Sequence, residues 1–180
     1  MEGQQYIALL RGINVGGNNI IKMTDLKSCF EGKGFTGVST YIQSGNVIFF
    51  SREHDKAKLT GRIEKELSER FTYSSRIVLK TYQELEAIVA GAPAGFGKSA
   101  GEYKYDVMFL REGLSSSDLR KQIPLKEGVD QVWDGPGVIY FSRLGSKSSQ
   151  SRLSRIMTMA FYREITIRNW NTTLKLLNFS

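Results

Sequence analysis

Histidine and cysteine are almost absent from this sequence. Its 180 residues include one of each, His54 and Cys29. One cysteine cannot form a disulfide within the chain, and one histidine with one cysteine is too few for a typical zinc site. We therefore expect no metal site, and a reducing cytoplasm is the default compartment. Cys29 falls on the apolar side of a predicted helix, so we interpret it as a core residue rather than a nucleophile. His54 lies among charged residues, and we expect it to be solvated.

Long hydrophobic runs are missing as well. No stretch approaches the roughly 20 apolar residues that a membrane helix needs. The apolar segment near the start, Tyr6–Leu10, is too short for a signal sequence. We therefore expect a cytoplasmic protein with no membrane partner.

The motifs of common enzyme classes are also missing. The segment Gly12–Gly17 lacks the Lys-Ser/Thr of a phosphate-binding loop and the glycine spacing of a dinucleotide-binding loop. No second histidine is present to activate a serine or cysteine, and no acidic pair stands out for acid–base chemistry. The sequence indicates no cofactor and favours a non-catalytic protein, although an enzyme stays open.

Positive charge, in contrast, is abundant and uneven. The formal net charge is +7. From Arg143 onward the chain has seven Lys and Arg residues against a single acid, Glu164. A localised basic surface favours anionic partners such as nucleic acid. The alternative is a solvated basic face that serves solubility, because charge predicts association rather than activity.

Hydrophobic periodicity divides the chain into two similar halves, each with the pattern β-α-β-β-α-β-α. In the segment Tyr6–Arg11, apolar residues occupy the odd as well as the even positions, so both faces of a strand here would be apolar. This indicates a strand that is covered on both faces. Gly45-Asn46 between two β-rich runs predicts a hairpin. Thr24 is expected to cap the first helix, and the apolar stripe of Ser151–Arg163 predicts a helix late in the second half.

Three segments of the first half are echoed, in order, in the second. Leu9–Arg11 matches Phe109–Arg111, Phe49–Arg52 matches Tyr140–Arg143, and Ile77–Tyr82 matches Ile165–Trp170. These echoes favour an internal duplication. We expect subdomains at residues 1–90 and 102–180, joined by a glycine-rich linker at residues 91–101.

The pattern predicts an α+β protein made of two ferredoxin-like (βαββαβ) subdomains in tandem, with antiparallel sheets and helices on one face. The other sheet face would then be bare. Because apolar strand faces seek cover, we expect it to be covered by the third helix of each half, by the other half, or by a second copy in a homodimer.

This topology brings two polar loops to one rim. The first two strands of a split βαβ unit run parallel, so the end of the first strand meets the turn after the second. Glycine N–H groups, side-chain amides and a guanidinium there could hold an anion or a polar ligand. In the alternative, the loop asparagines bond to their own backbone. The candidate rim residues are Arg11, Gly12, Asn14, Gly16, Gly17, Ser44, Gly45 and Asn46.

A second candidate lies near the C-terminus, at Arg168, Asn169 and Trp170. The internal repeat makes Asn169 a predicted helix N-cap and Trp170 a buried indole. The functional alternative is that Trp170 and Arg168 form a surface for base stacking and phosphate contact.

Four motifs together resemble one family: ALLRGINVGG, the IKM before the first helix, TYIQSGNV and the terminal RNWNT. The family is the uncharacterised, mainly bacterial domain of unknown function 1697, and the resemblance spans nearly the whole chain. It implies two ferredoxin-like halves and a cytoplasmic protein, and it brings no activity. It also gives more weight to the candidate residues of both sites and to Asn171, which match the family's motif positions.

Two hypotheses follow. The favoured one is a non-catalytic module that binds an anionic ligand, with nucleic acid preferred. The alternative is an enzyme that acts on a small polar or phosphorylated metabolite at the rim formed by Arg11, Asn14, Ser44 and Asn46.

Overall fold

The computed structural model of the chain describes residues 3–14, 17 and 19–179. The backbone forms two compact units. Unit 1 comprises Met1–Leu85 and Phe179–Ser180, and unit 2 comprises Glu86–Asn178. Each unit contains one four-stranded sheet. The glycine-rich segment at residues 91–101 belongs to unit 2 in this division.

Unit 1 contains the first six elements of the chain. The strand order in its sheet is β2-β3-β1-β4, and neighbouring strands are antiparallel. β1 and β2 therefore run parallel on either side of β3, which is the ferredoxin-like arrangement. The elements are β1 (Gln4–Leu10), α1 (Met23–Glu31), β2 (Thr36–Tyr41), β3 (Asn46–Ser51), α2 (Lys56–Phe71) and β4 (Ile77–Thr81), followed by α3 (Tyr82–Ala90).

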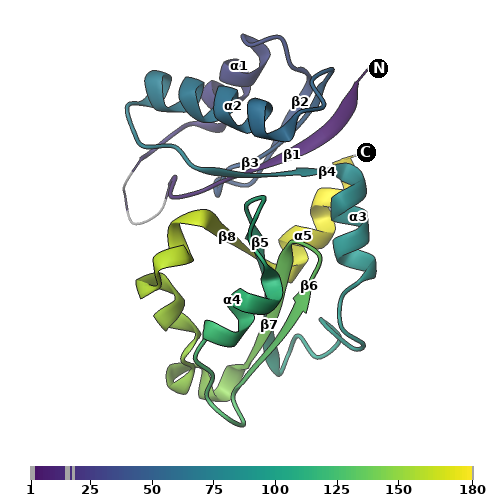
Figure 1. The fold of residues 1–180 in the computed structure, drawn as a ribbon, viewed down its shortest axis with the longest axis vertical. Coiled ribbons are helices and arrows are strands. Elements are labelled where there is room, and N and C mark those ends of the chain that lie inside the picture. The colour runs from purple at the N-terminus through teal and green to yellow at the C-terminus, as the bar shows by residue number, and fades with distance from the viewer. Residues whose placement is uncertain (1–2, 15–16, 18, 180) are drawn as a thin grey trace. The chain divides into compact units, whose positions relative to one another are not determined.

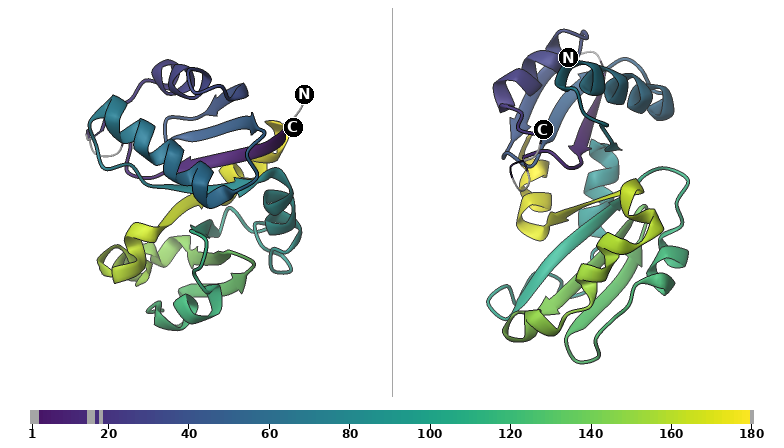
Figure 2. Two further views of the ribbon diagram at one scale, coloured as in Figure 1. Left: turned by 45° about the horizontal axis from the view of Figure 1, so that its top comes forward. Right: turned by 90° about the vertical axis from the view of Figure 1, so that its left-hand side faces the viewer.

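Helices α1 and α2 cover one face of this sheet (Figure 1 and Figure 2). Along β1, Tyr6, Ala8 and Leu10 belong to the core that includes the buried residues of both helices. Ile7 and Leu9 lie on the opposite face and are 1% exposed. Both faces of β1 are thus buried, as its doubly apolar pattern predicted.

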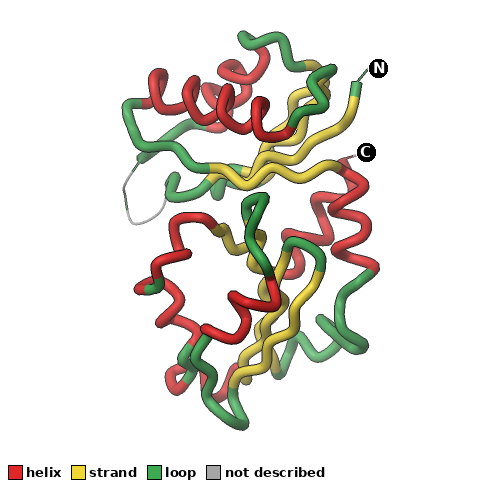
Figure 3. The backbone as a smooth tube through the Cα atoms, in the orientation of Figure 1, coloured by secondary structure: helices red, strands yellow, loops and turns green. Residues whose placement is uncertain are grey.

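Unit 2 repeats the strand order, with β6-β7-β5-β8 and antiparallel neighbours. Three short 3-10 helices connect β7 to β8 (Figure 3). The elements are β5 (Tyr103–Leu110), α4 (Ser116–Gln122), β6 (Asp130–Gly135), β7 (Val138–Leu144), η1 (Gly145–Gln150), η2 (Leu153–Thr158), η3 (Ala160–Glu164), β8 (Ile165–Asn169) and α5 (Trp170–Leu176), and η4 (Leu177–Phe179) follows. The prediction of two ferredoxin-like subdomains in an α+β protein is confirmed.

The prediction of an α-helix over Ser151–Arg163 is wrong. The region holds η2 and η3, with extended backbone at Met159 between them. The N–H of Leu153 donates to the hydroxyl of Ser151, and the N–H of Arg152 donates to Asp130. These side-chain acceptors compete with α-helical hydrogen bonds. The buried residues Leu153 and Ile156 are three apart, which suits a 3-10 repeat as well as an α-helix.

The N-termini of helices α1 and α3 differ in their capping. Thr24 is not an N-cap, because α1 begins at Met23 and its cap residue makes no side-chain hydrogen bond. Thr81 and Glu84, in contrast, form a capping box at the start of α3. The Thr81 N–H donates to Glu84 Oε2 at 2.7 Å, and the Glu84 N–H donates to Thr81 Oγ1 at 3.1 Å.

Aromatic residues cover the second face of the unit 2 sheet. Phe96, from the glycine-rich segment, meets the rings of four residues at centroid distances of 4.8–5.9 Å, which are Tyr105, Trp133, Tyr140 and Trp170. The Tyr140 hydroxyl donates to the carbonyl of Ile88 in α3 at 2.6 Å. The segment at residues 91–101 thus contributes to the packing of unit 2. Within the described part of the chain, no helix combines the length and apolarity needed to cross a membrane.

Candidate functional site

The predicted rim of unit 1 is present. At the end of β1, the Leu10 N–H donates to the Gly45 carbonyl at 2.8 Å. The Asn14 amide donates to the Gln43 carbonyl at 2.9 Å. The loop after β1 and the β2–β3 turn are therefore neighbours, as the strand order requires. Gly16 lies outside the described residues.

The rim asparagines bond to the chain itself. Besides Gln43, the Asn14 Nδ2 donates to the Ile21 carbonyl at 3.0 Å, and the Asn14 Oδ1 accepts from the Ile21 N–H at 2.8 Å. Asn19 donates to the Gly12 carbonyl at 2.8 Å, and Asn46 donates to the Tyr41 carbonyl at 2.8 Å. These bonds hold the loop in its fold, which favours the structural interpretation of the rim.

Backbone conformation explains the residue types of this loop. Gly12, Gly17 and Gly45 have φ angles of 70°, 79° and 78°, and Asn14 has a φ angle of 53°. Glycine and asparagine tolerate this left-handed region best. At Gly45 a Cβ atom would also lie 2.8 Å from the Cβ of Leu10. Backbone geometry thus accounts for the residue types at these four described positions.

The C-terminal candidates occupy unit 2. Asn169 caps α5, since its Oδ1 accepts from the Thr172 N–H at 2.7 Å. Arg168 is 8% exposed and donates to Thr166 Oγ1 at 2.8 Å. Burial lowers the pKa of Arg168 to about 10. Little of Arg168 is therefore accessible to a phosphate. Trp170 is half-buried and lines a pocket of about 260 Å³.

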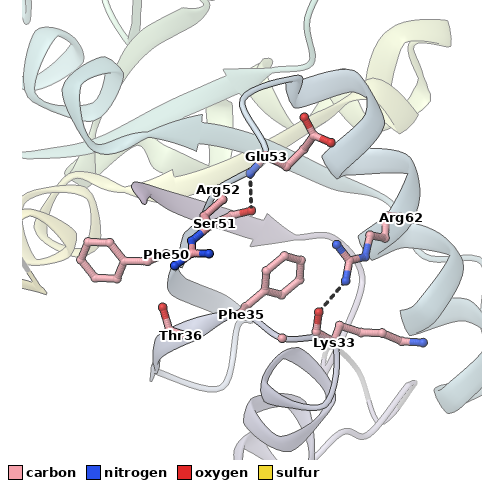
Figure 4. Close-up of a pocket in the computed structure, with 9 residues that line it drawn as sticks. Lys33, Phe35, Thr36, Phe50, Ser51, Arg52, Glu53 and Arg62 are labelled. Atoms are coloured by element: carbon pink, nitrogen blue, oxygen red, sulfur yellow. Dashed lines mark hydrogen bonds between the residues drawn. The ribbon is translucent and has the colours of Figure 1, made fainter. Parts of the chain in front are cut away.

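A larger concavity lies in unit 1, away from the positions singled out in the sequence. We call it the cationic groove. It has a volume of about 580 Å³ and lies where the α1–β2 turn, the end of β3 and the first part of α2 meet (Figure 4). The residues that define it here are Lys33, Phe35, Phe50, Arg52, Glu53 and Arg62.

Arg62 is the best-placed cation of this groove. Its guanidinium carbon lies 5.1 Å from the centre of the Phe35 ring, and Nη2 donates to the Lys33 carbonyl. Among the described residues, no carboxylate pairs with it. A guanidinium held by a ring and a carbonyl keeps its full charge for a ligand.

The other charges of the groove are partly balanced. Lys33 pairs with Glu66. Glu53 pairs with Lys58 at 2.6 Å, and hydrogen bonds from Lys58 and from the backbone lower the pKa of Glu53. The only carboxylate that lines the groove, among the residues that the structure describes, is thus already engaged by a lysine, and the lining has three cations against that one acid.

Sequence spacing offered no sign of this groove, because Lys33, Arg52 and Arg62 are far apart in the chain. The predicted strand order, however, was enough to indicate the groove. The turn before β2 and the end of β3 meet at the sheet edge opposite the rim. Applying the rim argument to that edge would have brought Lys33 and Arg52 together.

A model of the family described as "Protein of unknown function (DUF1697)" matches residues 4–140 of the chain. The chain belongs to this family. Its structure is also similar to that of the conserved bacterial protein SP0830 from Streptococcus pneumoniae. The TM-score is 0.84, the sequence identity is 28%, and the similarity covers 98% of each chain. No protein among the curated proteins matches.

The DUF1697 match covers the rim and the whole cationic groove, while Arg168, Asn169 and Trp170 lie beyond it. The resemblance found in the sequence motifs is thereby confirmed for the family. Within the part of the chain that the structure describes, no group of three or more His, Cys, Asp or Glu side chains is arranged to hold a metal ion.

Proposed function

We propose that this DUF1697 protein binds an anionic ligand in the cationic groove, and that the favoured ligand is single-stranded nucleic acid. The observation that carries the proposal is the placement of Arg62. Its guanidinium lies over Phe35 at the groove wall, and no carboxylate among the described residues neutralises it. The proposal includes a cytoplasmic location, because a lone cysteine suits a reducing compartment.

The groove favours nucleic acid over a simple anion because it combines cations with an aromatic side chain. Phe50 is half-buried and lines the groove together with Arg52. Phosphates need cations, and unstacked bases gain about 1–3 kcal/mol each from an aromatic face. The faces of the unit 1 sheet are buried at β1, so base stacking on an open sheet, as many ferredoxin-like RNA-binding domains use, is not the proposed mode.

Other exposed cations are available to a long polyanion. Four exposed cations lie along η1–η3 of unit 2, namely Lys147, Arg152, Arg155 and Arg163. Arg143 and Arg168, which belong to the same basic tail in the sequence, are not part of this surface, because one pairs with Asp106 and the other is buried. Nothing at the described rim favours the enzymatic alternative, since its amides are used by the chain.

The test is fluorescence anisotropy of labelled single-stranded RNA and DNA over a range of salt concentrations. For single strands, the slope of log K against log salt changes by about 0.7 for each phosphate that the protein neutralises. We expect Arg62→Ala to weaken binding and to reduce the slope by about that amount. Arg62→Lys should keep most of the slope, because it keeps the charge.

Lys65→Ala is the matched control. Lys65 lies on α2, one turn from Arg62, and its side chain is 76% exposed. It does not line the groove, so its replacement should leave the slope nearly unchanged. Equal effects of the two alanine variants would place binding elsewhere on the chain. An absence of salt-sensitive binding at low ionic strength would refute the proposal altogether.

A further inference from the structure

The first residues of β5 place two half-buried tyrosine rings on one face of the unit 2 sheet. Side chains alternate between the two faces along a strand. Met108 and Leu110 belong to the core on the helix-covered face, so Tyr103 and Tyr105 lie on the opposite face. This is the face on which Phe96 packs. We call Tyr103 and Tyr105 the tyrosine strip.

The charged residues of the same segment take no part in the tyrosine strip. Lys104 and Asp106 alternate with the tyrosines, so they lie on the helix-covered face. There Asp106 pairs with Arg143 at 3.3 Å. A ligand on the strip therefore meets aromatic rings and hydroxyl groups, and it does not meet the Asp106 carboxylate.

The tyrosine strip borders a concavity that a ligand can enter. A pocket of about 260 Å³ includes both tyrosines in its lining, together with Trp170 and two small residues, Gly97 and Ala100. β8 pairs with β5 only as far as Asp106, so it does not continue alongside the strip. Among the described residues, the two tyrosine hydroxyls and the indole N–H of Trp170 have no protein hydrogen-bond partner. These groups are available to the sugar and phosphate oxygens of a ligand.

The spacing of the two rings limits how a planar ligand can bind. Their centres lie 6.2 Å apart, and their planes are inclined by 42°. A base held between two rings needs parallel planes about 7 Å apart, which is twice the stacking repeat of about 3.4 Å. Each ring of the strip can therefore stack with one base. Since 6.2 Å exceeds that repeat, two neighbouring bases on the two rings must be unstacked from each other. Unstacked bases are a property of single strands.

We propose that the tyrosine strip is a second binding site for single-stranded nucleic acid, at which one or two unpaired bases stack on Tyr103 and Tyr105. The site has no sequence preference, because every base has a π-face. For its class of ligand it rests on the proposed function. It adds base stacking on unit 2 to the phosphate contacts of the cationic groove in unit 1.

Charge favours a polyanion over an apolar peptide at this strip. The formal net charge of the chain is +7. Two exposed lysines are close to the strip in the chain, since Lys98 follows the pocket residue Gly97 and Lys104 separates the two tyrosines. Exposed cations attract the phosphates that accompany each stacked base.

The experiment compares two labelled single strands of equal length by fluorescence anisotropy, an oligothymidylate and an abasic strand with the same number of phosphates. Tyr103→Leu should weaken binding of the oligothymidylate at least about fivefold, which is about 1 kcal/mol. The affinity for the abasic strand and the salt slope for both strands should stay unchanged, because stacking neutralises no phosphate. Tyr103→Phe should bind as the unmodified protein does, because it keeps the ring.

Two further variants separate stacking from damage to the fold. Among the described residues, Tyr103 contacts one other ring, that of Tyr105, so its replacement should leave unit 2 folded. Tyr105→Phe keeps both the packing on Phe96 and the affinity. Tyr162→Leu is the matched control, because Tyr162 is a half-buried tyrosine that packs on the core of the helix-covered face. It should bind both strands normally.

The two binding sites fail in different ways. Arg62→Ala lowers the salt slope with both strands, whereas Tyr103→Leu acts on the strand with bases alone. A loss in Tyr103→Leu with no effect of Arg62→Ala would support the tyrosine strip and refute the cationic groove. An unchanged affinity of Tyr103→Leu for the oligothymidylate, an equal loss with the abasic strand, or an equal loss in Tyr162→Leu would each overturn the tyrosine strip. An absence of binding to either strand would overturn both sites.

Discussion

Replacing Asn14 by alanine decides whether the rim loop is a structural or a ligand-binding feature. The side chain makes three hydrogen bonds, two with Ile21 and one with Gln43. At a net 0.5–1.5 kcal/mol each, their removal costs about 2–3 kcal/mol once solvent competition at the exposed bond is included. Alanine at a φ angle of 53° adds about 1 kcal/mol. We expect unit 1 to lose about 3–4 kcal/mol of stability.

Asn19→Ala is the control for this substitution. Asn19 also has a left-handed backbone, with a φ angle of 48°, but its side chain makes one exposed hydrogen bond, to Gly12. Its replacement should cost about 1–2 kcal/mol, which is the backbone contribution plus one weak bond. The difference between the two variants measures the additional hydrogen bonds of Asn14, which join it to Ile21 and to the β2–β3 turn.

The chain contains separate reporters for the two units. Cys29, its single cysteine, is buried in the unit 1 core, and burial raises the pKa of the thiol. Thiol labelling in increasing urea therefore follows the unfolding of unit 1. Both tryptophans, Trp133 and Trp170, belong to unit 2 and report it by fluorescence. Asn14→Ala should lower the urea midpoint of labelling more than that of fluorescence.

A destabilisation of less than about 0.5 kcal/mol in Asn14→Ala, or one no larger than that of Asn19→Ala, would contradict this reasoning. The loop would then owe its shape to other interactions. The Asn14 amide could then bind a ligand with little loss of stability, and the interpretation of the rim as a binding site would be favoured.

The fold was predictable because its signals are local and repeated. Each local signal indicates one element, and together these signals allow few topologies. They are the strands with apolar residues on both faces, the Gly45-Asn46 turn, and the helix caps at Thr81 and Asn169. The strand order followed from the βαββαβ pattern, and the neighbouring rim segments followed from the strand order. This chain of inference needs no knowledge of side-chain contacts.

Features that depend on distant side chains were missed. The η2 and η3 helices exist where Asp130, more than 20 positions earlier, binds the N–H of Arg152. Periodicity there indicated Leu153 and Ile156 correctly as buried residues, but it indicated the wrong helix type, and Met157 of the same apolar stripe is 60% exposed. Phe96 likewise stands in a segment that its composition marks as a linker, although its ring packs on a sheet.

Charge was the least predictable property of the candidate sites. Sequence counting treats every cation alike, yet Arg168 is buried and Arg143 pairs with Asp106, while Arg62 outside the basic tail is left without an acidic partner among the described residues. The availability of an arginine depends on what folding places beside it. A surface charge argument from sequence is therefore an argument about the whole chain and not about a site.

Two further substitutions test the packing and the electrostatics. At Gly97 an added Cβ would collide with the Trp170 indole, whereas at Gly95 it would meet nothing within 4 Å, and both have φ near 80°. Gly97→Ala should therefore lower the fluorescence-monitored stability of unit 2 by more than the roughly 1–2 kcal/mol that the backbone costs in Gly95→Ala, and equal destabilisation would contradict the steric argument. Burial raises the pKa of Glu84, but hydrogen bonds from Lys56 and from the backbone outweigh it, so the net pKa lies below the ordinary 4.5. A lowered folded-state pKa contributes stability that is present above the unfolded-state value and is lost as the pH falls through the folded-state value. The thermal stability gap between the unmodified protein and Glu84→Gln should consequently be full near neutral pH and should shrink in acid, and a gap that is constant with pH would show that the carboxylate charge contributes nothing.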